Sequence, residues 1–180
     1  MRALLLGFSL MMMSAACSAA ADAYHWVLPD SYLPQPTDSV LSINFKNPQQ
    51  VLLNLTFHVD DEWRDVPAET MRAEFIDGLL AVPGVKSGRR FVLKLPAQTL
   101  GKHQIPARDF YCQDWQGPGL KKGSKQIGRI CVLAQQALRV VVSLNSPAAQ
   151  AKAAAEDYQL ALSSLSLDWD ALVTLRDSQP

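Results

Sequence analysis

Apolar residues recur at every second position along two neighbouring stretches of the chain, residues 41–46 and 51–59. A period of two is typical of strands that bury one face, because successive side chains point to opposite sides. The Asn47-Pro48 dipeptide between the stretches is typical of a turn. The pattern therefore predicts an antiparallel hairpin with one buried face. Its apolar positions are Leu41, Ile43, Phe45, Val51, Leu53, Leu55, Phe57 and Val59.

Two longer segments have the apolar spacing of amphipathic helices. Residues 68–82 carry Met71, Phe75 and Leu79 at intervals of four, after Asp65-Val66-Pro67, which is typical of a helix start. The second helix is predicted to begin at Ser146-Pro147, with the serine as its cap and the proline at its first position. Its apolar face consists of Ala151, Ala155, Tyr158, Leu162 and Leu165.

The remaining pattern predicts the rest of one domain, residues 39–180. Residues 24–38 contain three prolines and three aromatic residues, which predict an extended lead-in to this domain. Apolar residues after Leu167 indicate a short last strand. The order of elements suits an α+β fold with an antiparallel sheet of about five to seven strands packed with two helices. The strands between the helices are expected at residues 91–95, 107–112, 130–133 and 138–144.

The C-terminal half of this pattern resembles the closing unit of the PsbP-like fold. That unit is a hairpin that ends in the strand ALRVVVSLNS (137–146) and continues into the helix PAAQAKAAAEDYQLALSSLSL (147–167). The resemblance spans about residues 129–167 and depends on the order of elements, without signature residues. The fold is shared by an extrinsic photosystem protein and several bacterial periplasmic lipoproteins. The resemblance implies an antiparallel sheet packed with helices and a binding or accessory role more often than catalysis.

The first 23 residues have the three-part pattern of a secretory signal. Arg2 precedes an apolar run of 11 residues, from Ala3 to Met13, which small residues follow. The run is roughly half as long as an apolar helix that crosses a bilayer. Cleavage would release Asp22 or Tyr24 as the new N-terminus, in the periplasm of a Gram-negative bacterium.

A lipoprotein signal of residues 1–16 is the alternative to cleavage at residues 21–23. Ser14-Ala15-Ala16 supplies the small residues that lipoprotein processing favours before Cys17, although the usual leucine three residues before the cysteine is missing. A lipid on Cys17 would tether the chain to the outer membrane without making it span the bilayer.

Two cysteines remain after such processing, Cys112 and Cys131. An even pair in an exported protein is most simply a disulfide, and the closed loop contributes roughly 3 kcal/mol to stability. A redox or metal pair is the rival interpretation. The 18 intervening residues do not match a C-x-x-C motif and contain no histidine, so the sequence favours the structural disulfide.

The formal net charge is zero, but the charges are segregated along the chain. Residues 22–85 contain ten acidic and three basic residues, whereas residues 86–129 contain ten basic and two acidic ones. Two interpretations follow. The folded surface has a dipole that steers a partner, or the two stretches pair with each other within the fold.

The strongest candidate for a binding site is the basic loop that the predicted disulfide encloses. Residues 117–125 contain the glycines, proline and serine of a loop, together with several lysines. Such a loop suits an anionic partner, and an acidic protein face is the expected one. Nucleic acid is not expected, because the interleaved aromatic and basic residues of a strand-binding sheet are absent. The candidate partner-binding residues are Lys121, Lys122, Lys125, Arg129, Trp115, Arg89 and Arg90. The competing explanation is that the lysines only keep a hairpin loop soluble.

No motif predicts catalysis, a cofactor or a metal. His58 precedes the carboxylates of residues 60–62, but adjacent side chains at a strand end alternate in direction and do not converge on one ion. The leading hypothesis is a periplasmic, non-enzymatic protein that binds a protein partner, either as an accessory factor of an envelope assembly or as an immunity protein. The alternative is a protein that binds a small ligand or an envelope polymer in a pocket between sheet and helices. An enzyme of unknown type is the third hypothesis.

Overall fold

The structure is a computed structural model that describes residues 23–39, 41–59, 62, 65–119, 122–135 and 138–177. Cys17 and Lys121, two residues with predicted roles, lie outside the described residues, as does the predicted export signal apart from Ala23. Among the described helices, none has the length and apolar character needed to cross a membrane.

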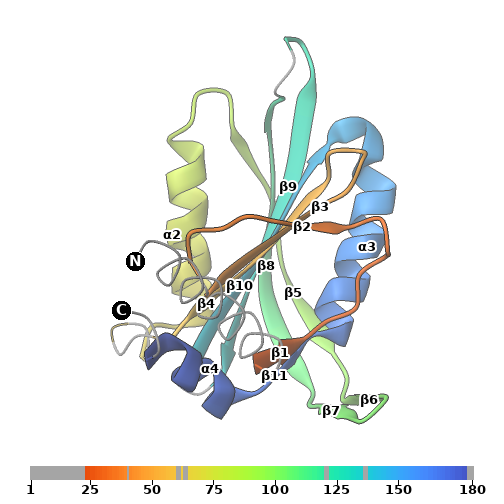
Figure 1. The fold of residues 1–180 in the computed structure, drawn as a ribbon. Coiled ribbons are helices and arrows are strands. Elements are labelled where there is room, and N and C mark those ends of the chain that lie inside the picture. The colour runs from red at the N-terminus through yellow and green to blue at the C-terminus, as the bar shows by residue number, and fades with distance from the viewer. Residues whose placement is uncertain are drawn as a thin grey trace, which may run out of the picture.

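A seven-stranded antiparallel sheet forms the centre of the molecule (Figure 1). Its strands, in spatial order, are β2 (Leu33–Gln35), β3 (Ser42–Lys46), β4 (Leu52–His58), β10 (Leu138–Pro147), β9 (Lys125–Gln135), β8 (Arg108–Pro118) and β5 (Lys86–Leu95). Two small sheets pair β1 (Tyr24–His25) with β11 (Ser166–Leu167), and β6 (Gln98–Leu100) with β7 (His103–Ile105). The α+β class and the expected number of strands are confirmed.

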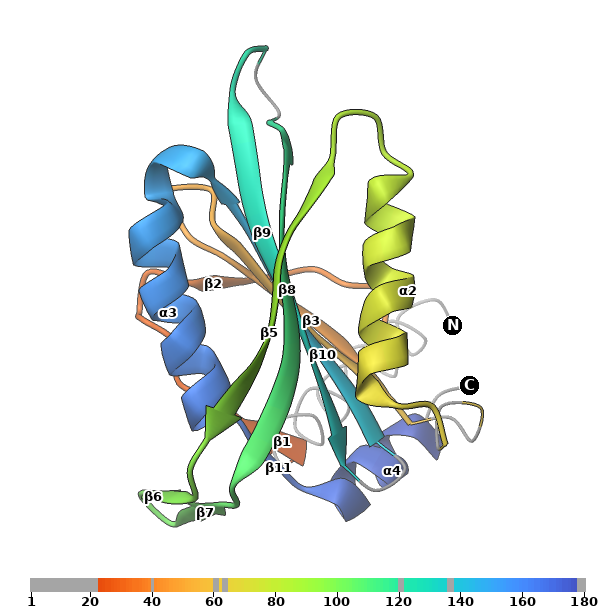
Figure 2. The same cartoon turned by 180° about the vertical axis from the view of Figure 1, so that it is seen from behind.

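Two helices cover opposite faces of this sheet. Figure 2 shows α2 (Ala68–Leu80) on one face and α3 (Ala151–Ser164) on the other. The predicted alternation explains the arrangement, because Leu53, Leu55 and Phe57 are buried on the α3 side of β4. The core on the α2 side is separate and consists of Ala68, Met71, Ile76, Trp115, Ile130, Val132 and Val141.

The predicted start of the second helix was wrong. Ser146 and Pro147 continue β10 and pair with β9, and Ser146 is fully buried. A short 3-10 helix, η2 (Ala148–Gln150), follows before α3 begins at Ala151. Pairing with a neighbouring strand outweighs the local preference of serine and proline for a helix start.

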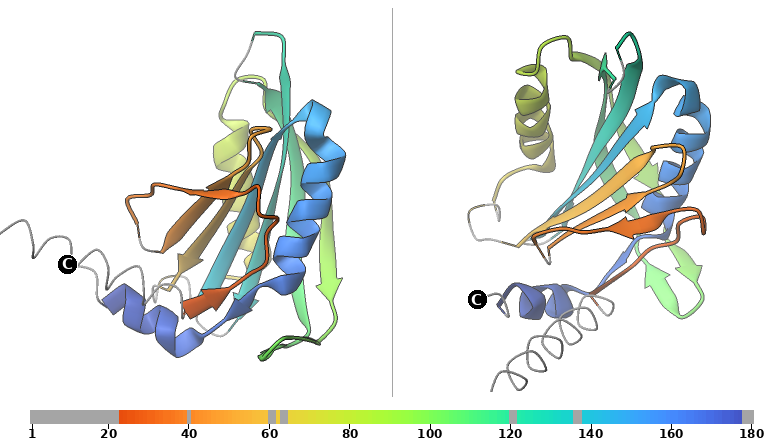
Figure 3. Two further views of the ribbon diagram at one scale, coloured as in Figure 1. Left: turned by 45° about the vertical axis from the view of Figure 1, so that its right-hand side comes forward. Right: turned by 45° about the horizontal axis from the view of Figure 1, so that its top comes forward.

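A third helix, α4 (Trp169–Asp177), replaces most of the predicted last strand at the lower end of the sheet (Figure 3). Only Ser166 and Leu167 form a strand. The side chain of Asp168 accepts a hydrogen bond of 3.0 Å from the backbone N–H of Ala171, which caps the helix. Leu172 and Leu175, three residues apart, are buried in the core on the α3 side. The Asp168 cap and the spacing of the two buried leucines are both sequence features that are typical of a helix.

The aromatic residues of the lead-in pack on the domain itself. The ring of Tyr24 lies 5.5 Å from that of Phe57, and Trp26 lies at the same distance from Phe45. The hydroxyl of Tyr32 donates a hydrogen bond of 2.9 Å to Asp157 on α3. The segment thereby ties β1 and β2 to the core on the α3 side.

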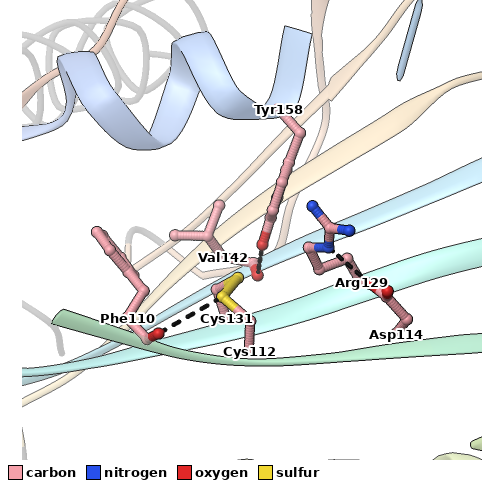
Figure 4. The surroundings of a disulfide bond; sticks show 7 residues. All are labelled: Phe110, Cys112, Asp114, Arg129, Cys131, Val142 and Tyr158. Atoms are coloured by element: carbon pink, nitrogen blue, oxygen red, sulfur yellow. Dashed lines mark hydrogen bonds and ion pairs between the residues drawn. A yellow bond between two sulfur atoms is a disulfide. The ribbon is translucent and has the colours of Figure 1, made fainter. Parts of the chain in front are cut away.

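Cys112 and Cys131 form the predicted disulfide (Figure 4). They are direct partners on β8 and β9, with their Cα atoms 4.1 Å apart, and both are fully buried. Tyr158 of α3 reaches down beside this disulfide and donates a hydrogen bond of 2.5 Å to the carbonyl of Val142. Burial raises the pKa of the Tyr158 hydroxyl well above its usual value near 10, because a phenolate there would lose its hydration.

We expect Tyr158 to make the fold sensitive to alkaline pH. Its pKa is higher in the folded than in the unfolded chain, so its contribution is complete below pH 10 and decreases as the pH rises above that value. Tyr158→Phe should lower the free energy of unfolding by about 1–2 kcal/mol at pH 7, because the hydrogen bond from the phenol to the Val142 carbonyl is lost. The same variant should show a shallower decrease above pH 10. Urea unfolding at a series of pH values tests this, and equal slopes for both proteins would contradict it.

Position 128 must be glycine because the indole of Trp115, its direct partner across β8 and β9, leaves no room for a side chain there. A methyl group at position 128 would lie 2.2 Å from the Cε2 atom of the Trp115 ring. We therefore expect Gly128→Ala to lower the free energy of unfolding by about 1–3 kcal/mol through overpacking.

Gly78→Ala in α2 is the matched control for this substitution. No heavy atom would lie within 4 Å of the new methyl group at position 78. This change should raise the free energy of unfolding by about 0.5–1 kcal/mol, since alanine favours a helix over glycine. Urea unfolding followed by tryptophan fluorescence measures both variants. If the Gly128→Ala protein were as stable as the wild type, glycine would not be required at position 128.

Candidate functional site

The β8–β9 hairpin extends beyond the other strands of the sheet at its upper end in Figure 1. Its outermost pair is Pro118 and Lys125, and the backbone N–H of Gly119 donates a hydrogen bond of 2.9 Å to the carbonyl of Ser124. Gly123 adopts a positive φ of 78°, which glycine allows without strain. The predicted basic loop is therefore the tip of a long, regular hairpin.

Lys122 and Lys125 are exposed at this tip. Among the residues that the structure describes, neither lysine has a carboxylate partner. The backbone around them is held by strand pairing on both sides and by the disulfide further down the hairpin. The tip thus presents positive charge on a supported backbone.

Two of the predicted arginines meet lower down, on the α3 side of the sheet. The guanidinium carbons of Arg89 and Arg129 lie 4.5 Å and 4.8 Å from the ring centre of Phe91. The Nε atom of Arg129 also donates a hydrogen bond of 2.6 Å to Asp114, its direct partner on β8 (Figure 4). We call Arg89, Phe91, Asp114 and Arg129 the arginine cluster.

Arg90 and Trp115 do not join this cluster. A β-bulge between Ser87 and Arg90 shifts the register of β5, so that Arg90 pairs with Gln113 and faces the α2 side. Trp115 is only 8% exposed and packs in the core beneath α2. The structure therefore separates the seven predicted residues into the exposed tip, the arginine cluster and two residues on the opposite face, with Lys121 outside the described residues.

A hollow of about 430 Å³ lies beside the arginine cluster, between the sheet and the first turns of α3. Arg89, Asp114 and Arg129 line it from the sheet. Ala151 and Ala155 line it from α3, and their small side chains leave the space open. Phe91, Asp114 and the two alanines are site residues that the sequence did not predict.

A buried arginine, Arg108, has a different role at the lower end of α3. Its Nη2 atom donates a hydrogen bond of 2.7 Å to the carbonyl of Leu162, and its Nη1 atom bonds to that of Leu165. Desolvation lowers the pKa of Arg108 to about 10. Its donors cap the free carbonyls at the C-terminus of the helix, so this arginine is explained by the fold.

No group of three potential metal-ligating side chains occurs within the described part of the chain. The ring of His58 lies 5.7 Å from that of Phe75 on α2. Asp60 and Asp61 lie outside the described residues, so the acidic group after His58 has no structural account.

Each ion pair between described side chains joins two residues of the same stretch of the chain. Among these described pairs, none links the acidic stretch 22–85 to the basic stretch 86–129. The pairs are Glu69–Arg72, Asp114–Arg129 and Arg176–Asp177.

No protein-family model and no curated protein sequence matches the chain. Solved structures do resemble it. Mog1p, a Ran-binding protein of Saccharomyces cerevisiae, has a TM-score of 0.51 at 12% sequence identity, over 83% of this chain and 93% of Mog1p. The cyanobacterial PsbP of Synechocystis, CyanoP, has a TM-score of 0.51 at 9% identity, over 82% of this chain and 88% of CyanoP.

A protein from Bacteroides thetaiotaomicron also has a TM-score of 0.51, at 11% identity over 81% of this chain, and the chain spans only 45% of that protein's length. At such identities the likeness concerns the fold alone. It extends the resemblance first noted over residues 129–167 to most of the chain. The chain has the PsbP-like fold.

Proposed function

We propose that this protein is exported to the periplasm and binds an acidic protein partner there through the tip of its β8–β9 hairpin. The observation that carries the proposal is the pair of lysines, Lys122 and Lys125, exposed on a projecting hairpin without carboxylate partners among the described residues. Charges at the rim of an interface steer association and select complementary surfaces. A hairpin supported by a disulfide presents them with little loss of backbone entropy on binding.

The fold is compatible with a binding role. Mog1p, which has this fold, is a Ran-binding protein. From this shared fold we infer only that the present chain is a non-enzymatic domain that binds another protein. An accessory factor of an envelope assembly and an immunity protein are both forms of this role.

Export is proposed from the N-terminal pattern. Arg2, the apolar run of 11 residues and the small residues after it form a secretory signal. Release after residue 21 or 23 would give a soluble periplasmic protein, whereas lipidation of Cys17 would tether the domain to the outer membrane. The buried disulfide suits an oxidising compartment under either form of processing.

Charge reversal at the tip tests the proposed interface. The tagged mature protein is used to capture partners from the envelope of its source, and the captured protein is then titrated against purified variants. Lys122→Glu with Lys125→Glu should weaken binding by about tenfold or more, mainly through slower association. The wild-type affinity should also fall with rising salt concentration, since the attraction is screened.

Lys94→Glu with Lys102→Glu is the matched control for this experiment. These two lysines are also exposed, but they lie near the opposite end of the strands. The control carries the same change of net charge and should keep the affinity of the wild type. Equal loss in both variants would indicate a general charge effect, and no loss in either would refute the hairpin interface. Mass spectrometry of the same sample identifies the processed N-terminus.

A further inference from the structure

The hollow between the sheet and α3 contains more positive than negative charge. Two arginines, Arg89 and Arg129, and one acidic residue, Asp114, are among the residues that line it. The Nε atom of Arg129 is bonded to Asp114, but its two terminal nitrogens have no hydrogen-bond partner among the described residues. Arg89 has no hydrogen-bond partner there either.

The two arginines are held in place before any ligand arrives. Both guanidinium groups lie against the single ring of Phe91, at 4.5 Å and 4.8 Å from its centre. The contact of a cation with an aromatic ring fixes the planar groups while their N–H donors stay available at the edges. The Arg129 side chain is only 21% exposed, so its unused donors lie in a partly desolvated site. A charge-assisted hydrogen bond from such a donor is stronger than one at an open surface.

Figure 4 shows which way these donors point. The Nε atom of Arg129 faces Asp114, and the terminal nitrogens point away from that carboxylate. A planar guanidinium with two free terminal groups matches the two oxygens of a carboxylate, or two oxygens of a phosphate.

The opposite wall of the hollow has a different chemistry. Ala151 and Ala155 of α3 provide an apolar surface there, and Leu144 of β10, the direct partner of Arg129 in the sheet, extends it. The first turn of α3 contains no acidic residue, and its cap residue, Gln150, makes no side-chain hydrogen bond to the helix. The positive end of the helix dipole therefore adds to the field of the two arginines. The volume of about 430 Å³ is within the usual range for a small-molecule site.

We propose that this hollow binds a small molecule that carries a carboxylate or phosphate group on an apolar body. Arg129 and Arg89 bind the oxyanion, and Ala151 and Ala155 contact the apolar part. Asp114 orients Arg129 through its hydrogen bond to the Nε atom. The site lies below the hairpin tip, uses different residues, and does not depend on the proposed protein partner.

Calorimetric titration of the mature protein with three probes tests the site: inorganic phosphate, acetate and hexanoate. All titrations are done at constant ionic strength set with chloride. Saturable binding should occur, and Arg89→Gln and Arg129→Gln should each raise the dissociation constant by about tenfold. Tighter binding of hexanoate than of acetate and phosphate identifies an apolar carboxylate as the ligand class. Tighter binding of phosphate identifies a phosphate ester.

Two further variants separate loss of the site from loss of the fold. Arg90→Gln removes the neighbouring arginine, which faces the α2 side, and should leave the dissociation constant unchanged. Ala155→Leu keeps the helix and fills the hollow, so it should abolish binding of hexanoate while α3 stays folded by circular dichroism. The lysine reversals at the tip should leave binding of all three probes unchanged.

Two results would overturn the proposal. One is the absence of saturable binding for all three probes up to about 50 mM, a dissociation constant that corresponds to a binding free energy of only about 2 kcal/mol. The other is binding that Arg89→Gln, Arg129→Gln and Ala155→Leu leave unchanged, which would place the anion elsewhere on the surface. Neither result tests whether the tip of the β8–β9 hairpin binds a protein partner. The two proposals can therefore be refuted independently.

Discussion

The central sheet carries apolar side chains on both of its faces, and each face requires its own cover. Strand β10 shows this most clearly, because Val140 and Val142 belong to the core on the α3 side while Val141, between them, belongs to the core on the α2 side. Burying both sets removes apolar area from water at roughly 25 cal/mol per Å². The two helices cannot cover the full length of the longest strands. The uncovered end of the β8–β9 hairpin is accordingly rich in glycine and lysine, which leaves it open to contact other molecules.

Alternation and helical spacing were enough to predict most of the fold. The hairpin of β3 and β4, the helix from residue 68 and the disulfide follow from local pattern and from cysteine number. The predictions that were wrong or incomplete concern segments in which pairing between strands, and not the local sequence, determines the structure. Ser146 has the character of a helix cap but pairs with Ile127, and Pro34 lies in an edge strand that only its contact with Phe45 reveals.

The candidate site was predictable in part, and one further step would have identified more of it. If Cys112 and Cys131 face each other on antiparallel strands, Asp114 must face Arg129 and Trp115 must face Gly128. That register gives the ion pair and assigns Trp115 to the opposite face. The bulge in β5 is different, since no local signal reveals which of Arg89 and Arg90 lies beside Phe91. The hollow itself depends on the distance between α3 and the sheet, which is a tertiary property.

The position of the disulfide also constrains the order in which the chain acquires its structure. Both sulfur atoms lie in the core on the α3 side, with Tyr158 beside them, and both cysteines are completely shielded from solvent. An enzyme or small molecule that oxidises thiols therefore has access to them only while α3 is undocked. We therefore expect the two cysteines to be joined before the helix closes over them. In the folded protein the same burial shields the disulfide from reductants. The disulfide therefore forms once, during folding, and persists for the lifetime of the folded chain.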